Sequence, residues 1–238
     1  WTGVRFLHAG ANMTGDELRI GTIWSDVVPA TTIQATVQEG FDYATGVLDG
    51  TQTNGVGFAP DSPWGLSSDA SIVAGLSYPD LAVSGAGALQ SSDGAFSHER
   101  TTASAYGGGT FYMSMLINVE GRETVRCGFE LRNSDGPLFG RVAGGWGMFA
   151  GPNGKLGISN SGGDFQTWTG VTNAADTAAH LIVAKIDYEV NAVKLFVDPA
   201  VSWTEPTPSA VLTTGGKWTV NLNSDLWTGI RFLHEGGD

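Results

Sequence analysis

The best candidate for a pair of catalytic carboxylates is the adjacent Asp16 and Glu17. Hydrolysis of a glycosidic bond needs two carboxyl groups that face each other across the substrate. The surrounding residues, 16–24, alternate between polar and apolar side chains, which predicts a β-strand. Because neighbouring side chains of a strand point to opposite faces, we expect the two carboxylates to be separated and to mark only the start of a strand.

The four histidines and the single cysteine lack the spacing of a metal site. His8 and His234 are equivalent positions of a repeated segment, and His98 and His180 are isolated. No HxH, HExxH or CxxC motif occurs in the chain. Cys127 lies in an alternating segment, so we expect a small buried hydrophobic residue without a disulfide partner.

Two turns rich in Asn, Asp and Gly, 160–164 and 221–225, carry hard oxygen ligands of the kind that Ca²⁺ binds. Their calcium candidates are Asp164 and Asp225. Ordinary turn chemistry explains the same residues. Ca²⁺ is the one cofactor for which the sequence offers candidate ligands.

The chain has eight tryptophans, and an exposed tryptophan can stack on a sugar ring. The candidates for a carbohydrate platform are Trp146, Trp168, Trp203 and Trp218. The alternative is that these residues pack in the core or between domains.

Composition narrows the class of partner. The 238 residues carry a net charge of −12, which argues against nucleic acid and anionic membrane surfaces as partners. No apolar run is long enough to insert in a membrane. The chain begins at Trp1 without a secretion signal, which we interpret as a processed or excerpted chain.

The elements that must position these residues are predicted to be strands. Alternating patterns favour strands at 1–8, at 16–24 with an end near residue 28, at 110–119, and in a hairpin of 180–188 with 192–197. Further strands are predicted at 41–43, 125–132, 146–150, 155–159 and 227–234. Trp64 and Tyr78 are expected to anchor the Gly-, Ser- and Pro-rich stretch after residue 43. The pattern predicts an all-β, antiparallel, two-sheet jelly-roll sandwich.

One segment occurs twice. Residues 1–10 read WTGVRFLHAG and residues 227–236 read WTGIRFLHEG, an offset of 227 − 1 = 226 residues and about the size of one large β domain. We interpret residues 1–28 as the closing strands of a preceding or neighbouring repeat, 29–40 as a linker, and 41–238 as the main domain without its own final strand.

The order of elements resembles the concanavalin A-like (LamG-like) jelly rolls of bacterial surface and secreted proteins. The matching segments are FDYATGVLDG at 41–50, GLSYPDLAVSGAGA at 75–88, GGGTFYMSMLINV at 107–119, AHLIVAKIDYEVNAVKLFVDP at 179–199 and GDELRIGTIWSDV at 15–27. The resemblance implies that 15–27 is the closing strand of this fold and that the protein is extracellular or on the cell surface. It also implies calcium at a sandwich rim in some relatives.

A domain without its closing strand leaves an open sheet edge, which recruits a strand from another copy or from the same chain folded back. The strand-exchange interface is predicted to comprise Leu18, Ile20, Ile23, Trp24, Phe41, Tyr43 and Phe232. If separate chains supply the strand, the contact is head-to-tail and does not close on itself, so a filament results.

Enzymes that share the resembled fold have motifs that this chain lacks. The E-x-D-x-x-E motif of its glycosidases is absent, and Glu130-Leu131-Arg132 matches only part of the R-x-E-L-R strand of its alginate lyases, because Gly128 stands where Arg is required. We therefore expect a non-catalytic structural repeat of a surface, adhesive or filament-forming protein whose partners are copies of itself. The alternative is a carbohydrate-binding module with a polysaccharide partner, and a weaker one is a glycan-active hydrolase or lyase that uses Glu17 or Glu130.

Overall fold

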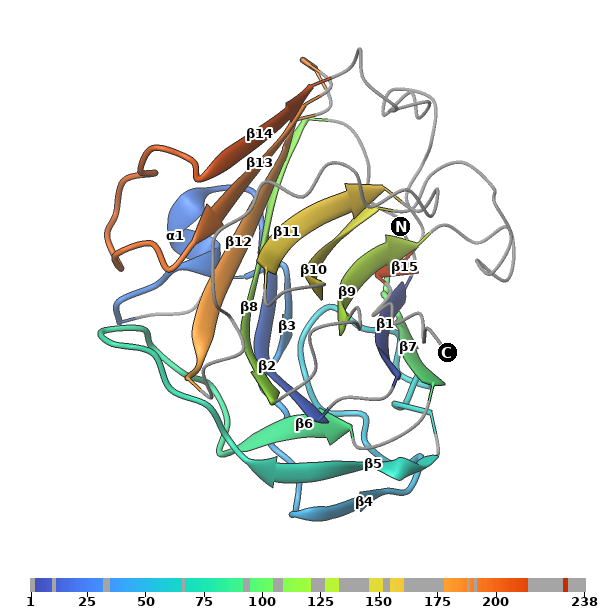
Figure 1. Ribbon diagram of the computed structural model, residues 1–238. Coiled ribbons are helices and arrows are strands. Elements are labelled where there is room, and N and C mark those ends of the chain that lie inside the picture. Colours follow the sequence, from blue (N-terminus) through green and yellow to red (C-terminus); the bar gives the residue numbers. More distant parts are fainter. Residues whose placement is uncertain are drawn as a thin grey trace.

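The protein is an all-β chain in which almost every strand pairing is antiparallel (Figure 1). The computed structural model describes residues 3–9, 12–31, 35–65, 67–91, 95–104, 109–120, 127–132, 146–151, 155–160, 178–187, 189–190, 192–213 and 229–230. Its strands form two hydrogen-bonded sheets, of six and nine strands. Among the described strands the one parallel pair is β1 with β15.

The six-stranded sheet has the order β11-β10-β9-β15-β1-β7. Its strands are β1 (Gly3–Ala9), β7 (Ala95–Thr101), β9 (Cys127–Arg132), β10 (Trp146–Gly151), β11 (Lys155–Asn160) and β15 (Gly229–Ile230).

The nine-stranded sheet has the order β14-β13-β12-β8-β2-β6-β5-β4, with β3 also paired to β2. Its strands are β2 (Asn12–Gly21), β3 (Val37–Glu39), β4 (Gly46–Leu48), β5 (Ser67–Ala74), β6 (Gly87–Ser91), β8 (Thr110–Glu120), β12 (His180–Asp187), β13 (Ala192–Val197) and β14 (Ala210–Thr213). In Figure 1 the part from β6 to β4 is turned out of the plane of the part from β14 to β2.

Both faces of β8 are buried, which places the core on either side of the nine-stranded sheet. Tyr112 and Leu116 face a cluster around Trp24, whereas Met113 and Met115 are buried on the opposite face. The first face is covered by α1 (Trp24–Val27), a single helical turn, and by the loops that carry Leu81 and Val201.

The strands at 110–119 and 180–197 are confirmed, because β8, β12 and β13 have the predicted bounds to within a residue or two. The strand predicted to run to residue 28 ends instead at Gly21. The Asp26 carboxylate accepts hydrogen bonds from the backbone N–H groups of Thr22 and Ile23, which turns the chain into α1.

The prediction of a strand at 41–43 is wrong. Phe41 has a positive φ of 49°, outside the range of a strand, and its N–H donates to the Glu39 carboxylate. The neighbouring strand is β3, which lies inside the segment interpreted as a linker, 29–40, and pairs with β2.

The first two strands lie in different sheets. β1 runs between β7 and β9, whereas β2 runs between β8 and β6 of the same chain, and Figure 1 shows both in blue. In this molecule residues 12–21 therefore occupy a central position of the nine-stranded sheet, in the arrangement of a chain folded back on itself.

Candidate functional site

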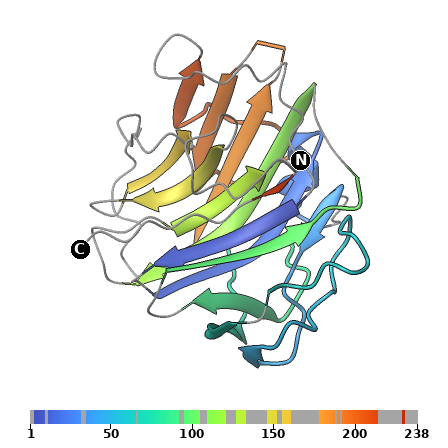
Figure 2. The ribbon, with the colours of Figure 1, turned by 90° about the vertical axis from the view of Figure 1, so that its right-hand side faces the viewer.

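The first copy of the repeated segment is paired on both of its sides. From Gly3 to Ala9, β1 pairs residue by residue with β7, and Figure 2 shows the two strands side by side. On its other side, residues 5–7 pair with residues 130–128 of β9. A strand with two hydrogen-bonded neighbours is an interior strand of its sheet.

The second copy reaches the same strand, β9, in the same register. Gly229 lies opposite Arg132 and Ile230 opposite Leu131. The pairing of Arg5 with Glu130, continued by one residue, would place Val4 opposite Leu131. Ile230 is the repeat equivalent of Val4, so both copies have one register on β9, and these two residues pair with each other in parallel.

Most of the predicted strand-exchange residues lie in the core of their own chain. Leu18, Ile20, Trp24 and Phe41 are buried, and Tyr43 is half-buried with its hydroxyl donating to Glu39. Ile23 is exposed, and Phe232 lies outside the described residues. The structure instead shows a contact of β9 with both copies of the repeated segment, which differs from the predicted interface.

A buried ion pair lies next to this contact and joins the two sheets. Arg100 of β7 is the backbone partner of Val4, and its side chain donates to the Glu39 carboxylate of β3 over 2.6 Å. Both side chains are at most 1% exposed. The guanidinium lies 3.9 Å above the Phe58 ring, a cation–π contact that further restricts it.

The remaining donors around Glu39 hold its carboxylate inside the protein. Its oxygens accept from the Trp64 indole N–H at 2.8 Å, the Tyr43 hydroxyl at 3.0 Å and the Phe41 N–H at 2.9 Å. Burial raises the pKa of Glu39, and the Arg100 charge opposes that rise. Trp64 is fully buried and confirms its predicted role as an anchor.

Asp16 and Glu17 do not mark the start of a strand, contrary to the prediction, because β2 begins at Asn12 and a bulge interrupts its regular alternation at these two residues. The register of β2 on β8 shifts between Asp16 and Arg19, and Glu17 has a φ of 51°. This bulge buries both carboxylates, at 1% exposure each. The Glu17 N–H donates to Asp16 Oδ1 at 2.7 Å, and the Leu76 N–H donates to Asp16 Oδ2 at 2.7 Å.

Burial and the adjacent Glu17 carboxylate raise the pKa of Asp16 to about 8. Glu17 itself accepts hydrogen bonds from Arg19 and from the backbone N–H and hydroxyl of Ser84. Arg19 is also buried, and its Nε and Nη1 have no hydrogen-bond partner. These contacts fasten the loop around Ser84 to β2.

Both groups of carboxylates, the pair Asp16 and Glu17 and the single Glu39, are bonded to internal donors. A catalytic acid must reach the bond that it protonates, whereas Asp16, Glu17 and Glu39 are buried and bonded to internal donors. Glu130 is described only through its backbone, which pairs with Arg5 and Gly147.

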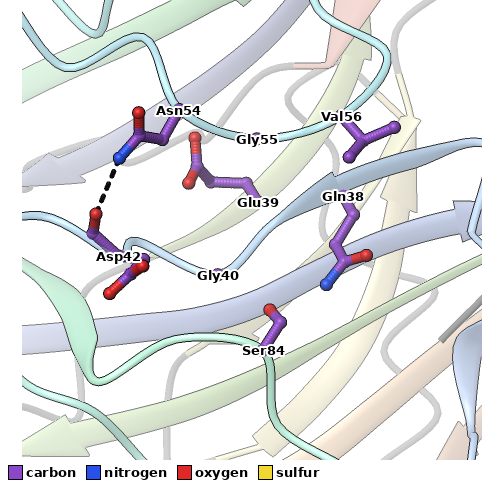
Figure 3. Close-up of a pocket in the computed structure, with 8 residues that line it drawn as sticks. All are labelled: Gln38, Glu39, Gly40, Asp42, Asn54, Gly55, Val56 and Ser84. Atoms are coloured by element: carbon purple, nitrogen blue, oxygen red, sulfur yellow. Dashed lines mark hydrogen bonds between the residues drawn. The ribbon is translucent and has the colours of Figure 1, made fainter. Parts of the chain in front are cut away.

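A pocket of about 220 Å³ lies at the surface above Glu39 (Figure 3). Its lining residues are Gln38, Glu39, Gly40, Asp42, Asn54, Gly55, Val56 and Ser84. The pocket is smaller than the roughly 300 Å³ at which small-molecule sites begin, and none of the described residues that line it has an aromatic side chain on which a sugar could stack.

Of the proposed carbohydrate platform, Trp203 is 70% exposed. Trp146 lies in β10, where only its backbone is described, and Trp168 and Trp218 lie outside the described residues. The calcium candidates Asp164 and Asp225 also lie outside them. Within the described part of the chain, no three His, Cys, Asp or Glu residues are grouped to hold a metal ion.

The sequence analysis did not identify two residues of this region, Glu39 and Arg100. Glu39 sits at the end of a Thr- and Gln-rich stretch, and Arg100 lies in a run of polar residues, so neither carries a local signal. The two residues are 61 positions apart in the sequence, and only the fold brings them into contact.

No helix among the described residues is long and apolar enough to cross a membrane. Comparisons of the chain with family models, with curated proteins and with solved structures find no match.

Proposed function

We propose that the chain is a non-catalytic structural repeat of an extracellular surface or filament-forming protein, with copies linked in series through the repeated strand. The observation that carries the proposal is the shared register of Val4 and Ile230 on β9. Serial linkage of equal units requires a strand that recurs once per unit and pairs with the same acceptor strand. The repeated segment recurs after 226 residues, and both copies pair with β9.

The proposed architecture is a two-sheet jelly roll of the concanavalin A-like type. It is supported by the two hydrogen-bonded sheets and by contacts of β10 with β12 and of β11 with β13. The non-catalytic role is supported by the internal bonding of the buried carboxylates Asp16, Glu17 and Glu39. Cell-surface location and adhesion are part of the proposal because of the resemblance of the element order to jelly rolls of bacterial surface proteins.

The experiment is a concentration series of the purified chain, from micromolar to millimolar, followed by light scattering and negative-stain electron microscopy. We expect open-ended oligomers with a repeat of about one domain length, and fewer of them in a Phe232→Pro chain. A particle that stays monomeric over the whole series would contradict serial linkage.

A carbohydrate-binding module is the second candidate, and the exposure of Trp203 favours it. A glycan array with wild-type and Trp203→Ala chains tests it. Saturable binding that is lost on substitution of Trp203 would support this function, and an array without binding would remove it.

A further inference from the structure

The edge of β9 that faces away from β10, residues 128–132, is here named the acceptor edge. Residues 128–130 of this edge pair with Leu7, Phe6 and Arg5, whereas residues 131–132 pair with Ile230 and Gly229. Opposite residues 131–132 the first copy is no longer paired with β9, although its Gly3 and Val4 remain paired with β7. The second copy is therefore inserted between β9 and β1 at one end of β1.

The sequence of the second copy would allow this insertion to continue with the same residue types that the first copy presents to β9. The residues that follow Ile230 are Arg231, Phe232 and Leu233, which are the same residue types as Arg5, Phe6 and Leu7. In the shared register they would take the positions opposite Glu130, Phe129 and Gly128. Each backbone hydrogen bond that the first copy gives up on β9 would be replaced by an equivalent one.

We propose that residues 227–234 are a donor strand for the acceptor edge of a second copy of this chain, where they take the register held here by residues 1–8. The inference rests on the proposed serial linkage and names the segment and the edge that form it. The two copies divide the acceptor edge between them in this structure, and the full length of the edge has room for only one of them.

A second copy of the chain is the partner because the edge already selects this sequence twice. Eight of the ten residues in the two copies are identical, and the other two positions are Val4/Ile230 and Ala9/Glu235. Exchange between equal strands is close to neutral in free energy, since the bonds lost and gained match. The outcome is then decided by effective concentration, which favours the first copy because residues 10–11 tether it to β2.

This balance dictates how the donor strand is detected. In the wild-type chain the acceptor edge is occupied, so an acceptor chain is needed whose own two copies are disabled. Phe6→Pro removes a backbone N–H at a residue that pairs with both His98 and Phe129. Phe232→Pro does the same to the equivalent residue of the second copy.

The first experiment mixes the Phe6→Pro/Phe232→Pro acceptor with wild-type chain, whose first copy can hold its own acceptor edge while the second copy is donated. We expect a one-to-one complex with twice the chain mass of 24.8 kDa, measured by size-exclusion chromatography with light scattering. A donor with Phe232→Pro alone is the matched control and should form no complex. Absence of the complex with wild-type donor would overturn the proposal.

A synthetic peptide of residues 227–236 is the second donor, followed by fluorescence anisotropy and circular dichroism. It should bind the acceptor at one peptide per chain and bind the wild-type chain, whose edge is filled, at least about tenfold more weakly. If the acceptor is unfolded alone, recovery of its β signal on addition of the peptide is the expected result. A folded or unfolded acceptor that ignores the peptide would contradict the donor strand.

Register is tested by a disulfide between chains. A donor with Cys127→Ser and Ile230→Cys should crosslink to an acceptor with Cys127→Ser and Leu131→Cys. The control acceptor retains Cys127, four residues away on the same strand, and has the native Leu131. Crosslinking to Cys127 in place of Cys at 131 would overturn the register.

The two proposals fail separately. Complex formation together with a monomeric wild type at all concentrations would support the donor strand and contradict the serial function. Filaments that persist in the Phe232→Pro chain, with no complex in the mixing experiment, would support serial assembly by another contact and overturn the donor strand.

Discussion

Glu39 and Arg100 form an ion pair of 2.6 Å that links β3 of one sheet to β7 of the other. The Arg100 side chain also donates to the backbone carbonyls of Ser62 and Thr53, at 2.7 and 3.0 Å. One cation therefore holds both the adjoining loop and the strand against which β1 pairs.

We predict that Arg100→Met destabilises the protein by about 3–5 kcal/mol, because it leaves the Glu39 carboxylate buried without its cation. The double variant Glu39→Gln/Arg100→Met should recover part of that loss, since the amide needs no counter-charge. Urea unfolding of the four chains in a double-mutant cycle measures the coupling. Strictly additive effects would show that the pair does not act as a unit.

The raised pKa of Asp16 predicts a pH dependence of stability. Its pKa is about 8 in the folded chain and 3.8 in the unfolded chain, so the folded state binds more protons between these values. The stabilisation is complete below about pH 4 and is lost as the pH rises towards 8, with a slope of at most about 1.4 kcal/mol per pH unit.

Chemical unfolding at pH 5, 6, 7 and 8 should show this slope in the wild-type chain and a flatter one in Asp16→Asn, which stays neutral. Asp49→Asn is the control, because hydrogen bonds from Thr51 lower the pKa of the exposed Asp49. Equal slopes in wild type and Asp16→Asn would refute the assignment of this dependence to Asp16.

Gly85→Ala should destabilise the protein by about 1–3 kcal/mol through a steric clash. A Cβ at Gly85 would lie 2.0 Å from the carbonyl oxygen of Gly40, where the chain near β3 crosses the loop before β6. Gly109→Ala separates this effect from backbone strain, because Gly109 has a φ of 65° but open space around it. Thermal unfolding should rank Gly85→Ala as the less stable of the two, and the reverse order would exclude the clash.

Substitution of two tryptophans should change the free energy of unfolding by very different amounts. Trp24 is buried, with Phe196 and Tyr112 at ring-centroid distances of 5.0 and 6.1 Å, so Trp24→Ala should cost about 3–5 kcal/mol. Trp203→Ala should change the free energy of unfolding by no more than about 0.5 kcal/mol, because Trp203 is exposed. Comparable losses for both would mean that Trp203 packs against a part of the chain outside the described residues.

Strand periodicity predicted the fold class and the long strands, because alternation of apolar residues reports directly on a half-buried or buried sheet. This holds for β8 and for the hairpin of β12 and β13. It failed after Gly21, where the apolar residues Ile23, Trp24 and Val27 suggested that the strand continued, but the Asp26 carboxylate binds the preceding backbone and turns the chain. A local hydrogen bond of this kind outweighs periodicity.

The site was less predictable than the fold, since its contacts join residues far apart in the sequence. The repeat itself was visible, but the meeting of Ile230 with Leu131 depends on the register of β9. The bulge at Glu17 was also invisible, because a positive φ at a non-glycine residue has no signature in an alternating pattern.

The central positions of β1 and β2 have a consequence for cleavage of the backbone. Ala30 and Thr31 are exposed and follow both strands, and a protease cut there would leave β2 paired with β8 and β6 and β1 paired with β7 and β9. The two fragments would then stay associated as a nicked but intact particle. A row of such units would keep its continuity after a single cut at this connection, because the severed parts are held by whole strands in two different sheets.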